Sequence, residues 1–169
     1  MKPMIGFLSL VLLAGTIQAE DRIIHRDGKP LLGVTYPNDW KETKEDNHVI
    51  AISPDGQAWS ITSILEGITD QEAGIAKIKE GLENYLTDIE YDEMAKTERG
   101  STILSGTGKG KDSGVDLVFT TGVFPSGENR LSAIVFIIDA DIEEFYKNTV
   151  LAICRSIRVE SDFALPEQQ

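Results

Sequence analysis

The chain contains a single cysteine and only two histidines in 169 residues. Cys154 has no second cysteine with which to close an internal disulfide, so the fold must rely on its hydrophobic core. His25 and His48 lie in different segments, and neither has a cysteine or another histidine at the spacing of a metal site. The sequence therefore argues against structural zinc and against histidine-based catalysis, and we expect no cofactor.

Motifs for nucleophilic or phosphate chemistry are also lacking. No Gly-x-Ser-x-Gly sequence is present, so a serine nucleophile has no support. The glycine-rich stretch 106–112 resembles a phosphate loop, but Ser105 replaces the first required glycine and Asp112 replaces the required hydroxyl residue. We interpret this stretch as a hairpin loop between two strands, whose Lys109 and Lys111 are available to an acidic partner.

Basic residues are few compared with acidic ones. The chain has 16 Lys and Arg against 28 Asp and Glu, which gives a formal net charge of -12. A field of this sign repels nucleic acids and anionic membrane surfaces, and it favours cationic partners or divalent ions. The acidic residues are spread along the chain, so solubility also explains the excess. Calcium binding by loop carboxylates such as Glu42, Glu45 and Asp46 stays open, with solvation or helix capping favoured.

A hydrophobic run occurs at the start of the chain, over 4–13. It is too short to span a bilayer, and Ile17 and Ala19 suit the specificity of a signal peptidase. Thr16 stands where a lipoprotein signal would need a cysteine. We therefore expect residues 1–19 to be a signal peptide that is cleaved near Ala19. The mature protein is expected in the periplasm or outside the cell, with no membrane span and no lipid anchor.

The rest of the chain has the length of one domain. Both faces of 131–138 are mostly apolar, which predicts a central strand covered on both sides. The segment 139–158 has apolar residues at helical spacing, Phe145 among them, and this predicts a helix over that strand. Cys154 is expected to be a small buried hydrophobe beside the apolar stripe of that helix. We expect one domain over residues 20–160 and a flexible tail over 161–169.

Turn residues divide the remaining sequence into short β-rich runs. A capping box at Thr69–Glu72 predicts a helix that continues to about Ile89, with Gly81 at a close approach to another backbone. Residues 41–47 are expected to be a polar loop, and Asp139 is expected to cap the last helix. This order is that of an α+β domain with a mostly antiparallel sheet and two main helices packed on it. The predicted strands are 22–26, 31–36, 48–53, 58–65, 91–98, 101–107 and 115–124.

Short motifs along the chain carry a resemblance to a known fold family. Val34–Trp40 is similar to a Tyr-Pro-x-x-Trp motif, Ile52–Gly56 closes a strand, and Ile153–Ile157 ends the last helix. Their order and separation resemble the PsbP-like fold family. This family includes the extrinsic PsbP subunit of photosystem II, a nuclear Ran-GTPase-binding protein and small bacterial extracytoplasmic proteins. The resemblance implies an α/β/α sandwich and an accessory or binding protein more often than an enzyme, and it supplies no catalytic residue.

These observations lead to two hypotheses of function from different classes. The first is a non-enzymatic, exported accessory protein that binds another protein, with an immunity-type inhibitor of a secreted toxin as one version. The second is a small-ligand carrier whose pocket lies between the sheet and a helix, walled by Trp40, Trp59 and Tyr85. An enzyme ranks third. The candidate partner or ligand surface comprises these aromatic residues with Lys109 and Lys111, and we expect a monomer.

Overall fold

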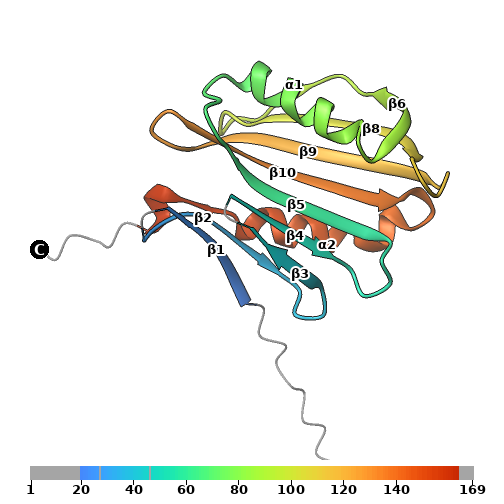
Figure 1. The fold of residues 1–169 in the computed structure, drawn as a ribbon, viewed down its shortest axis with the longest axis horizontal. Coiled ribbons are helices and arrows are strands. Elements are labelled where there is room, and N and C mark those ends of the chain that lie inside the picture. The colour runs from blue at the N-terminus through green and yellow to red at the C-terminus, as the bar shows by residue number, and fades with distance from the viewer. Residues whose placement is uncertain (1–19, 27, 46, 164–169) are drawn as a thin grey trace, which may run out of the picture.

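The computed structural model describes residues 20–26, 28–45 and 47–163, so the predicted signal peptide lies outside the described residues. Within the described ranges the chain folds into two antiparallel sheets and two α-helices, arranged in layers (Figure 1). This confirms the predicted α+β class. The strands are β1 (Glu20–Arg26), β2 (Lys29–Tyr36), β3 (Lys41–Lys44), β4 (His48–Ile52), β5 (Ala58–Leu65), β6 (Leu86–Tyr91), β7 (Ala95–Lys96), β8 (Thr102–Gly110), β9 (Asp116–Gly127), β10 (Arg130–Asp139) and β11 (Arg158–Val159). The helices are α1 (Gln71–Leu82) and α2 (Glu143–Ser156), with short 3₁₀ helices η1 (Ala140–Ile142) and η2 (Glu160–Phe163).

Strand β10 occupies the middle of the larger sheet. The order of this sheet is β3-β4-β5-β10-β9-β8-β6, with β7 paired to β8, and the neighbours are antiparallel. Every side chain from Leu131 to Ile138 is buried. Leu131, Ala133, Val135 and Ile137 share a cluster with α1, and the alternate residues face the opposite layer. The prediction of a central strand covered on both sides is confirmed.

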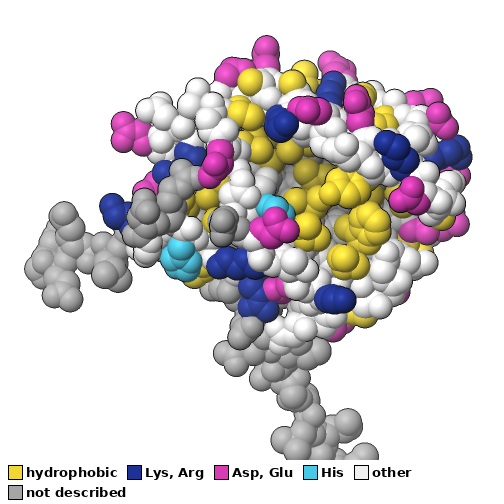
Figure 2. Space-filling model, in the orientation of Figure 1, with side chains coloured by type: hydrophobic (Ala, Val, Ile, Leu, Met, Phe, Trp, Pro, Cys, Tyr) yellow, Lys and Arg dark blue, Asp and Glu magenta, His cyan; other side chains and the backbone are white. Residues whose placement is uncertain are grey.

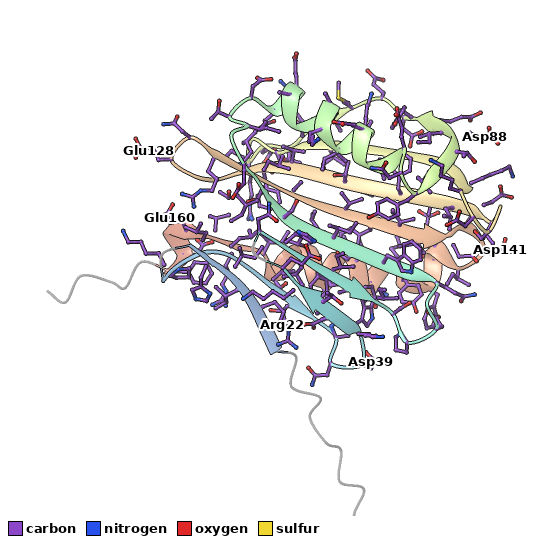
Figure 3. The ribbon with its side chains drawn as sticks, in the orientation of Figure 1. Arg22, Asp39, Asp88, Glu128, Asp141 and Glu160 are labelled. Carbon is purple, nitrogen blue, oxygen red and sulfur yellow. The ribbon has the colours of Figure 1, made fainter. Side chains whose placement is uncertain are left out.

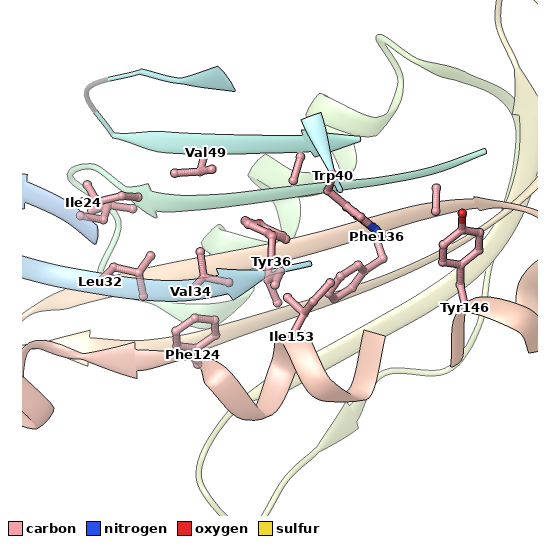
Figure 4. Packing of buried hydrophobic residues seen from close by; sticks show 14 of the residues in the cluster. Ile24, Leu32, Val34, Tyr36, Trp40, Val49, Phe124, Phe136, Tyr146 and Ile153 are labelled. Carbon is pink, nitrogen blue, oxygen red and sulfur yellow. The ribbon is translucent and has the colours of Figure 1, made fainter. Parts of the chain in front are cut away.

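The opposite layer combines α2 with the smaller sheet, whose order is β1-β2-β11. The predicted hairpin of β1 and β2 is confirmed by their antiparallel pairing. Figure 4 shows Val34 from β2, Phe136 from β10 and Ile153 from α2 in one hydrophobic cluster. The buried Tyr36 hydroxyl lies 2.8 Å from the Thr62 hydroxyl, so a polar contact also joins the two sheets.

Helix α1 has different ends from those predicted. Its N-cap is Asp70 rather than Thr69, since the Asp70 carboxylate accepts a hydrogen bond from the Ala73 amide at 2.9 Å. The helix ends at Leu82 rather than near Ile89, because backbone hydrogen bonds of the shorter i→i+3 type close its last turn before β6 begins. The apolar spacing continues past this point, so the pattern alone overestimates the helix.

The predicted polar loop at 41–47 is wrong for its first part, which forms strand β3 at the edge of the larger sheet. This strand pairs with β4 in register, although its polar residues lack the apolar alternation of a half-buried strand. Charged side chains are common at sheet edges because they discourage pairing with another chain. An ion pair between Glu42 of β3 and Arg22 of β1 also links the edges of the two sheets.

Helix α2 begins after η1, and the Asp139 carboxylate accepts a hydrogen bond from the Asp141 amide at 3.0 Å. Asp139 therefore caps the 3₁₀ helix η1, whereas α2 has Ile142 at its N-cap and no side-chain cap, so the predicted capping of the last helix is confirmed only for the turn that precedes it. The predictions that Phe145 belongs to the buried stripe and that Cys154 is buried are wrong, because Phe145 is 76% exposed and Cys154 is exposed. The buried residues of α2 are Tyr146 and Ile153, and a residue one position away points about 100° around the helix.

The C-terminal part of the described chain packs on the domain. Residues 161–163, which the sequence analysis assigned to the tail, lie in η2. Glu160 at the start of η2 forms an ion pair of 2.8 Å with Arg130 at the start of β10. The Arg158 guanidinium lies 4.9 Å from the centre of the Phe163 ring.

The glycine-rich stretch resembling a phosphate loop belongs mainly to β8, where three of its glycines alternate along the strand. Gly106, Gly108 and Gly110 therefore share one face of the sheet. A Cβ atom at Gly106 would collide with the Glu90 carbonyl oxygen and would lie 2.6 Å from the Phe119 ring. These glycines let the backbone of β6 and large side chains of β9 approach β8 closely.

The predicted close approach at Gly81 is wrong, since an added Cβ there would meet nothing within 4 Å. The close approach is at Gly74, on the buried side of α1. A Cβ at Gly74 would lie 3.0 Å from Val123 and 3.2 Å from Leu65. The absence of a side chain at this position lets α1 lie close to the sheet.

We predict that alanine has opposite effects at two of these glycines. Gly81→Ala should raise the free energy of unfolding by up to about 1 kcal/mol, because alanine favours a helix interior. Gly106→Ala should lower it by about 1–3 kcal/mol, because the Glu90 backbone and Phe119 would have to move. Urea unfolding followed by circular dichroism measures both changes. An unchanged midpoint for Gly106→Ala would contradict the close packing of β6 on β8.

Candidate functional site

Helix α1 covers only part of its side of the larger sheet. It packs on β8, β9 and β10, and Figure 1 shows β5, β4 and β3 extending beyond it. On this side Ile52 of β4 lies opposite Trp59 of β5, and Ile50 lies opposite Ile61. These four side chains remain partly or largely accessible. We refer to Ile50, Ile52, Trp59 and Ile61 as the open face.

At one end the open face continues into a cleft of about 350 Å³. The sheet contributes Trp59, Leu117 and Ile137, and the connection between α1 and β6 contributes Tyr85. The turn between β8 and β9 lines the remaining side, with Val115 at its end. Figure 2 shows hydrophobic side chains gathered in a hollow to the right of centre on this face. The cleft exists because α1 ends at Leu82, before it reaches this end of the sheet.

The indole ring of Trp59 is held in place at the mouth of the cleft. Its Nε1 donates a hydrogen bond to the Gly56 carbonyl at 3.0 Å. Gly56 has a φ of 73°, a conformation that the turn between β4 and β5 requires and that glycine adopts without strain. The polar edge of the ring is therefore satisfied within the protein, and the part that remains exposed is apolar.

Asp55 stabilises the turn that orients Trp59. Its carboxylate accepts hydrogen bonds from the Ser53 hydroxyl at 2.5 Å, the Gln57 amide at 3.0 Å and the Tyr146 hydroxyl at 2.8 Å. The Ser53 hydroxyl first, and then the Gln57 amide, lower the pKa of Asp55 below its usual value because they stabilise the charged form. The bond from Tyr146 also connects this turn to α2.

The two lysines of the candidate surface already have acceptors within the protein. The Lys109 ammonium lies 2.5 Å from the Asp116 carboxylate, and this hydrogen bond raises the pKa of Lys109. The Lys111 ammonium donates to the Glu83 carbonyl at 3.3 Å, at the C-terminal end of α1. The Lys111 amide donates to the Tyr85 carbonyl at 2.8 Å, which joins the β8–β9 turn to the opposite wall of the cleft.

The structure brings together part of the surface suggested by the sequence. Trp59, Tyr85 and Lys111 line the same cleft. Lys109 lies near the end of β8, beside the cleft rather than among its lining residues. Trp40 lies in the core on the opposite side of the sheet, stacked on Tyr36 with a centroid distance of 6.1 Å, so it cannot wall this cleft.

The apolar residues Leu86, Leu117 and Ile137 of the cleft were not predicted as part of a binding surface. In the sequence, Leu117 and Ile137 lie in predicted strands and Leu86 lies in the predicted helix, and each is indistinguishable there from a core residue. Their position at one end of the sheet becomes relevant only because α1 is short. Asp112 and Asp139 were the available sequence signal for the cleft, because Asp139 directly follows a predicted strand and Asp112 lies in the predicted hairpin loop between two strands.

Charged residues are few in the lining of the cleft. Its charged lining residues are Lys111, Asp112 and Asp139, and neither histidine nor cysteine is among the described lining residues. Across the described part of the chain, no three or more His, Cys, Asp or Glu side chains gather as a metal site. In the same residues, no helix has the length and apolar character needed to cross a membrane.

Comparison with known proteins identifies the fold and no sequence family. No protein-family model and no curated protein matches the sequence. The Ran-binding protein Mog1p of Saccharomyces cerevisiae has a TM-score of 0.59 and 11% identity, covering 88% of this chain and 100% of that one. Cyanobacterial PsbP (CyanoP) from Synechocystis sp. PCC 6803 has a TM-score of 0.55 and 13% identity, covering 86% and 95%. The protein therefore has a PsbP/Mog1-like fold.

We predict that ionised Asp55 protects the indole N–H of Trp59 from hydrogen exchange. Asp55→Asn should accelerate this exchange, because the amide replaces one charged acceptor oxygen with a donor. In the unchanged protein, protection should persist as pH falls through the usual carboxyl range and should be lost only near the lowered pKa of Asp55. NMR exchange of the indole proton, alongside titration of the Asp55 carboxyl, measures both. Asp92→Asn serves as a control, and equal exchange rates in all three proteins would contradict this role.

Proposed function

We propose that this protein is exported and that it acts without catalysis, by binding another protein through the open face and the adjoining cleft. The observation that supports this most directly is the concentration of exposed large hydrophobic side chains around one cleft. Trp59 is 37% exposed, Val115 is 41% exposed and Tyr85 is 45% exposed. Apolar surface that is contiguous and rimmed by polar residues is typical of interaction sites.

The shape of this surface suits a protein partner. The open face is a sheet surface on which apolar side chains of a partner can pack, and the cleft beside it can receive one anchoring side chain. Interfaces commonly combine such a pocket with a surrounding apolar area, and tryptophan and tyrosine dominate their binding energy. The shared fold with Mog1p, which is described as Ran-binding, supports a macromolecular partner by analogy.

Export is supported by the first nineteen residues of the sequence. Removal of residues 1–19 would also remove Lys2, leaving 15 basic against 28 acidic residues and a formal charge of -13. Such a protein would be repelled by anionic lipid surfaces and nucleic acids, so its partner is expected to be neutral or basic. A protein that acts outside the cytoplasm by surface binding needs neither a cofactor nor a reactive thiol.

The alternative function, a small-ligand carrier, is favoured by the volume of the cleft. About 350 Å³ falls within the range of small-molecule sites, near its lower end. The accessible lining is mostly apolar. A few polar residues reach it from the turn between β4 and β5 and from the turn between β8 and β9. Native mass spectrometry of the freshly purified protein distinguishes this function, because a carrier would retain an additional small mass and a protein-binding surface would not.

We predict that the open face and the cleft carry the binding energy for a partner. Trp59→Ala combined with Tyr85→Ala should weaken recovery of the partner from a periplasmic extract about tenfold or more, as expected for truncation of interface anchors. Phe145→Ala is the matched control, since Phe145 is an exposed aromatic residue on α2, in the layer on the other side of the sheet. Equal losses in the control, with all variants folded by circular dichroism, would contradict the proposed surface.

We predict that the exported protein begins at Glu20. Mass spectrometry of protein recovered from the periplasmic or extracellular fraction of producing cells should give the mass of residues 20–169. Ala19→Arg should block processing and leave the longer chain, because signal peptidases require a small residue at the cleavage site. Recovery of the full chain, with Met1 or Lys2 at its start, in the cytoplasmic fraction would contradict export.

A further inference from the structure

The charges around the cleft are predominantly negative. Asp112 and Asp139 are among its lining residues. Asp88 in β6 and Asp141 in η1 lie at the same end of the molecule, as Figure 3 shows, and Glu128 lies at the opposite end. Asp116, which pairs with Lys109, and Lys111 also lie in this region.

Lys111 is the one positively charged residue among the described lining residues of the cleft, and Lys109 lies beside it. Lys109 is held at 2.5 Å by Asp116, and Asp88 adds to the negative surroundings of its ammonium group. The Lys111 ammonium lies at the C-terminal end of α1, near the Glu83 carbonyl, where the helix dipole favours a positive charge. Asp112 and Asp139 together with Lys111 give the described cleft lining a formal net charge of -1.

Aromatic rings line the same cleft as these carboxylates. A cation is attracted to the face of a tryptophan or tyrosine ring, and more strongly when water is partly excluded. Trp59 and Tyr85 supply such rings, and the hydrogen bond from Trp59 to Gly56 fixes the orientation of the indole. Val115, which is 41% exposed, and the partly buried Leu117 provide apolar surface for an aliphatic chain. The lining thus combines aromatic faces, carboxylates and apolar surface.

Among protein side chains, arginine fits this combination best. Its planar guanidinium stacks on aromatic rings and can form two parallel hydrogen bonds with a carboxylate, which the compact ammonium of lysine cannot do. Its aliphatic stem suits apolar surface. An acidic side chain would be repelled by Asp112 and Asp139, and a purely aliphatic one would gain nothing from their charge.

We infer that the cleft binds an arginine side chain of the protein partner, presented by a basic segment that places an apolar residue on the open face. The inference rests on the proposed function, from which it takes the protein partner, and it adds the chemistry of the recognised segment. The acidic balance of the whole chain would attract such a segment from a distance.

Short peptides test this inference on the intact protein. Capped Gly-Arg-Leu-Gly is titrated into isotopically labelled protein and compared with two versions, in which citrulline or glutamate replaces arginine. Citrulline keeps the shape of the side chain and removes its charge. The arginine peptide should shift the NMR signals of the Trp59 indole and of residues 110–113, and it should bind at least about fivefold more tightly than the citrulline peptide. Equal affinity for the three peptides, or shifts confined to other surfaces, would overturn the inference.

Matched variants distinguish recognition of arginine by the cleft carboxylates from attraction by the net negative charge of the whole protein. Asp112→Asn and Asp139→Asn should each weaken binding of the arginine peptide about two- to fivefold, the range for exposed ion pairs. Asparagine can still cap at position 139, so the fold should be kept. Glu98→Gln and Glu128→Gln, each made singly, are the controls, because each makes the same change in net charge at an exposed turn away from the cleft. An equal loss in the controls would show that only net charge matters and would overturn the arginine site.

The two proposals can fail separately. Loss of arginine preference, with partner recovery from the extract still dependent on Trp59 and Tyr85, would reject the arginine site and leave the proposed function standing. Specific peptide binding in the cleft, together with partner recovery that is unaffected by these aromatic residues, would support the arginine site and reject the open face as the partner surface.

Discussion

Burial of β10 on both sides is the constraint from which the rest of the architecture follows. A strand whose side chains are apolar at every position loses solvent contact on two faces at once, so it needs a complete layer on each side. One layer is α1. The other combines α2 with the β1–β2–β11 sheet, and Tyr36 reaches from that layer to hydroxyls on β5. The chain uses elements from both of its ends to build the second layer, which explains why the N-terminal hairpin packs beside the last helix.

The two layers differ in how much of the sheet they can cover. Helix α1 has 12 residues and β10 has 10, which correspond to lengths of roughly 18 Å and 33 Å. A helix of this length that packs closely through Gly74 covers only part of the sheet, and it leaves Trp59 on the neighbouring strand β5 accessible. The open face and the cleft are therefore consequences of the length of α1. They arise where the layer stops, and they expose residues that would be core in a longer helix-covered sheet.

Several elements could be predicted from the sequence because their signals are local. The apolar run 131–138, the turn residues around Gly28 and Gly56, and the carboxylate of Asp139 each specify a strand, a turn or a cap within a few residues. The end of α1 could not be predicted in this way. The apolar spacing of Leu82, Leu86 and Ile89 fits a continued helix, and only pairing of β6 with the glycine face of β8 decides for a strand.

The candidate site, like the fold, could be predicted from the sequence only where the signal is local. Trp59 and Tyr85 can be selected from the sequence as large aromatic residues near turns, and the structure places both at one cleft. Trp40 is also a large aromatic residue near a turn, yet it lies in the core. Pro37 and the turn that follows it direct the Trp40 ring toward Tyr36 and Tyr146. Whether an aromatic residue is core or surface depends on which layer reaches it, and that is a property of the assembled sheet.

An exposed apolar surface also carries a risk of association between copies of the chain. The polar edge strand β3 discourages pairing between sheets, and the carboxylates around the cleft repel the equally acidic surface of a second copy. The same carboxylates do not oppose a basic partner. In the proposed interface, charge selects among the partner surfaces that can cover Trp59 and Tyr85, and the aromatic rings supply most of the contact area. The carboxylates would then provide specificity by repulsion, and the aromatic residues would provide affinity by apolar contact.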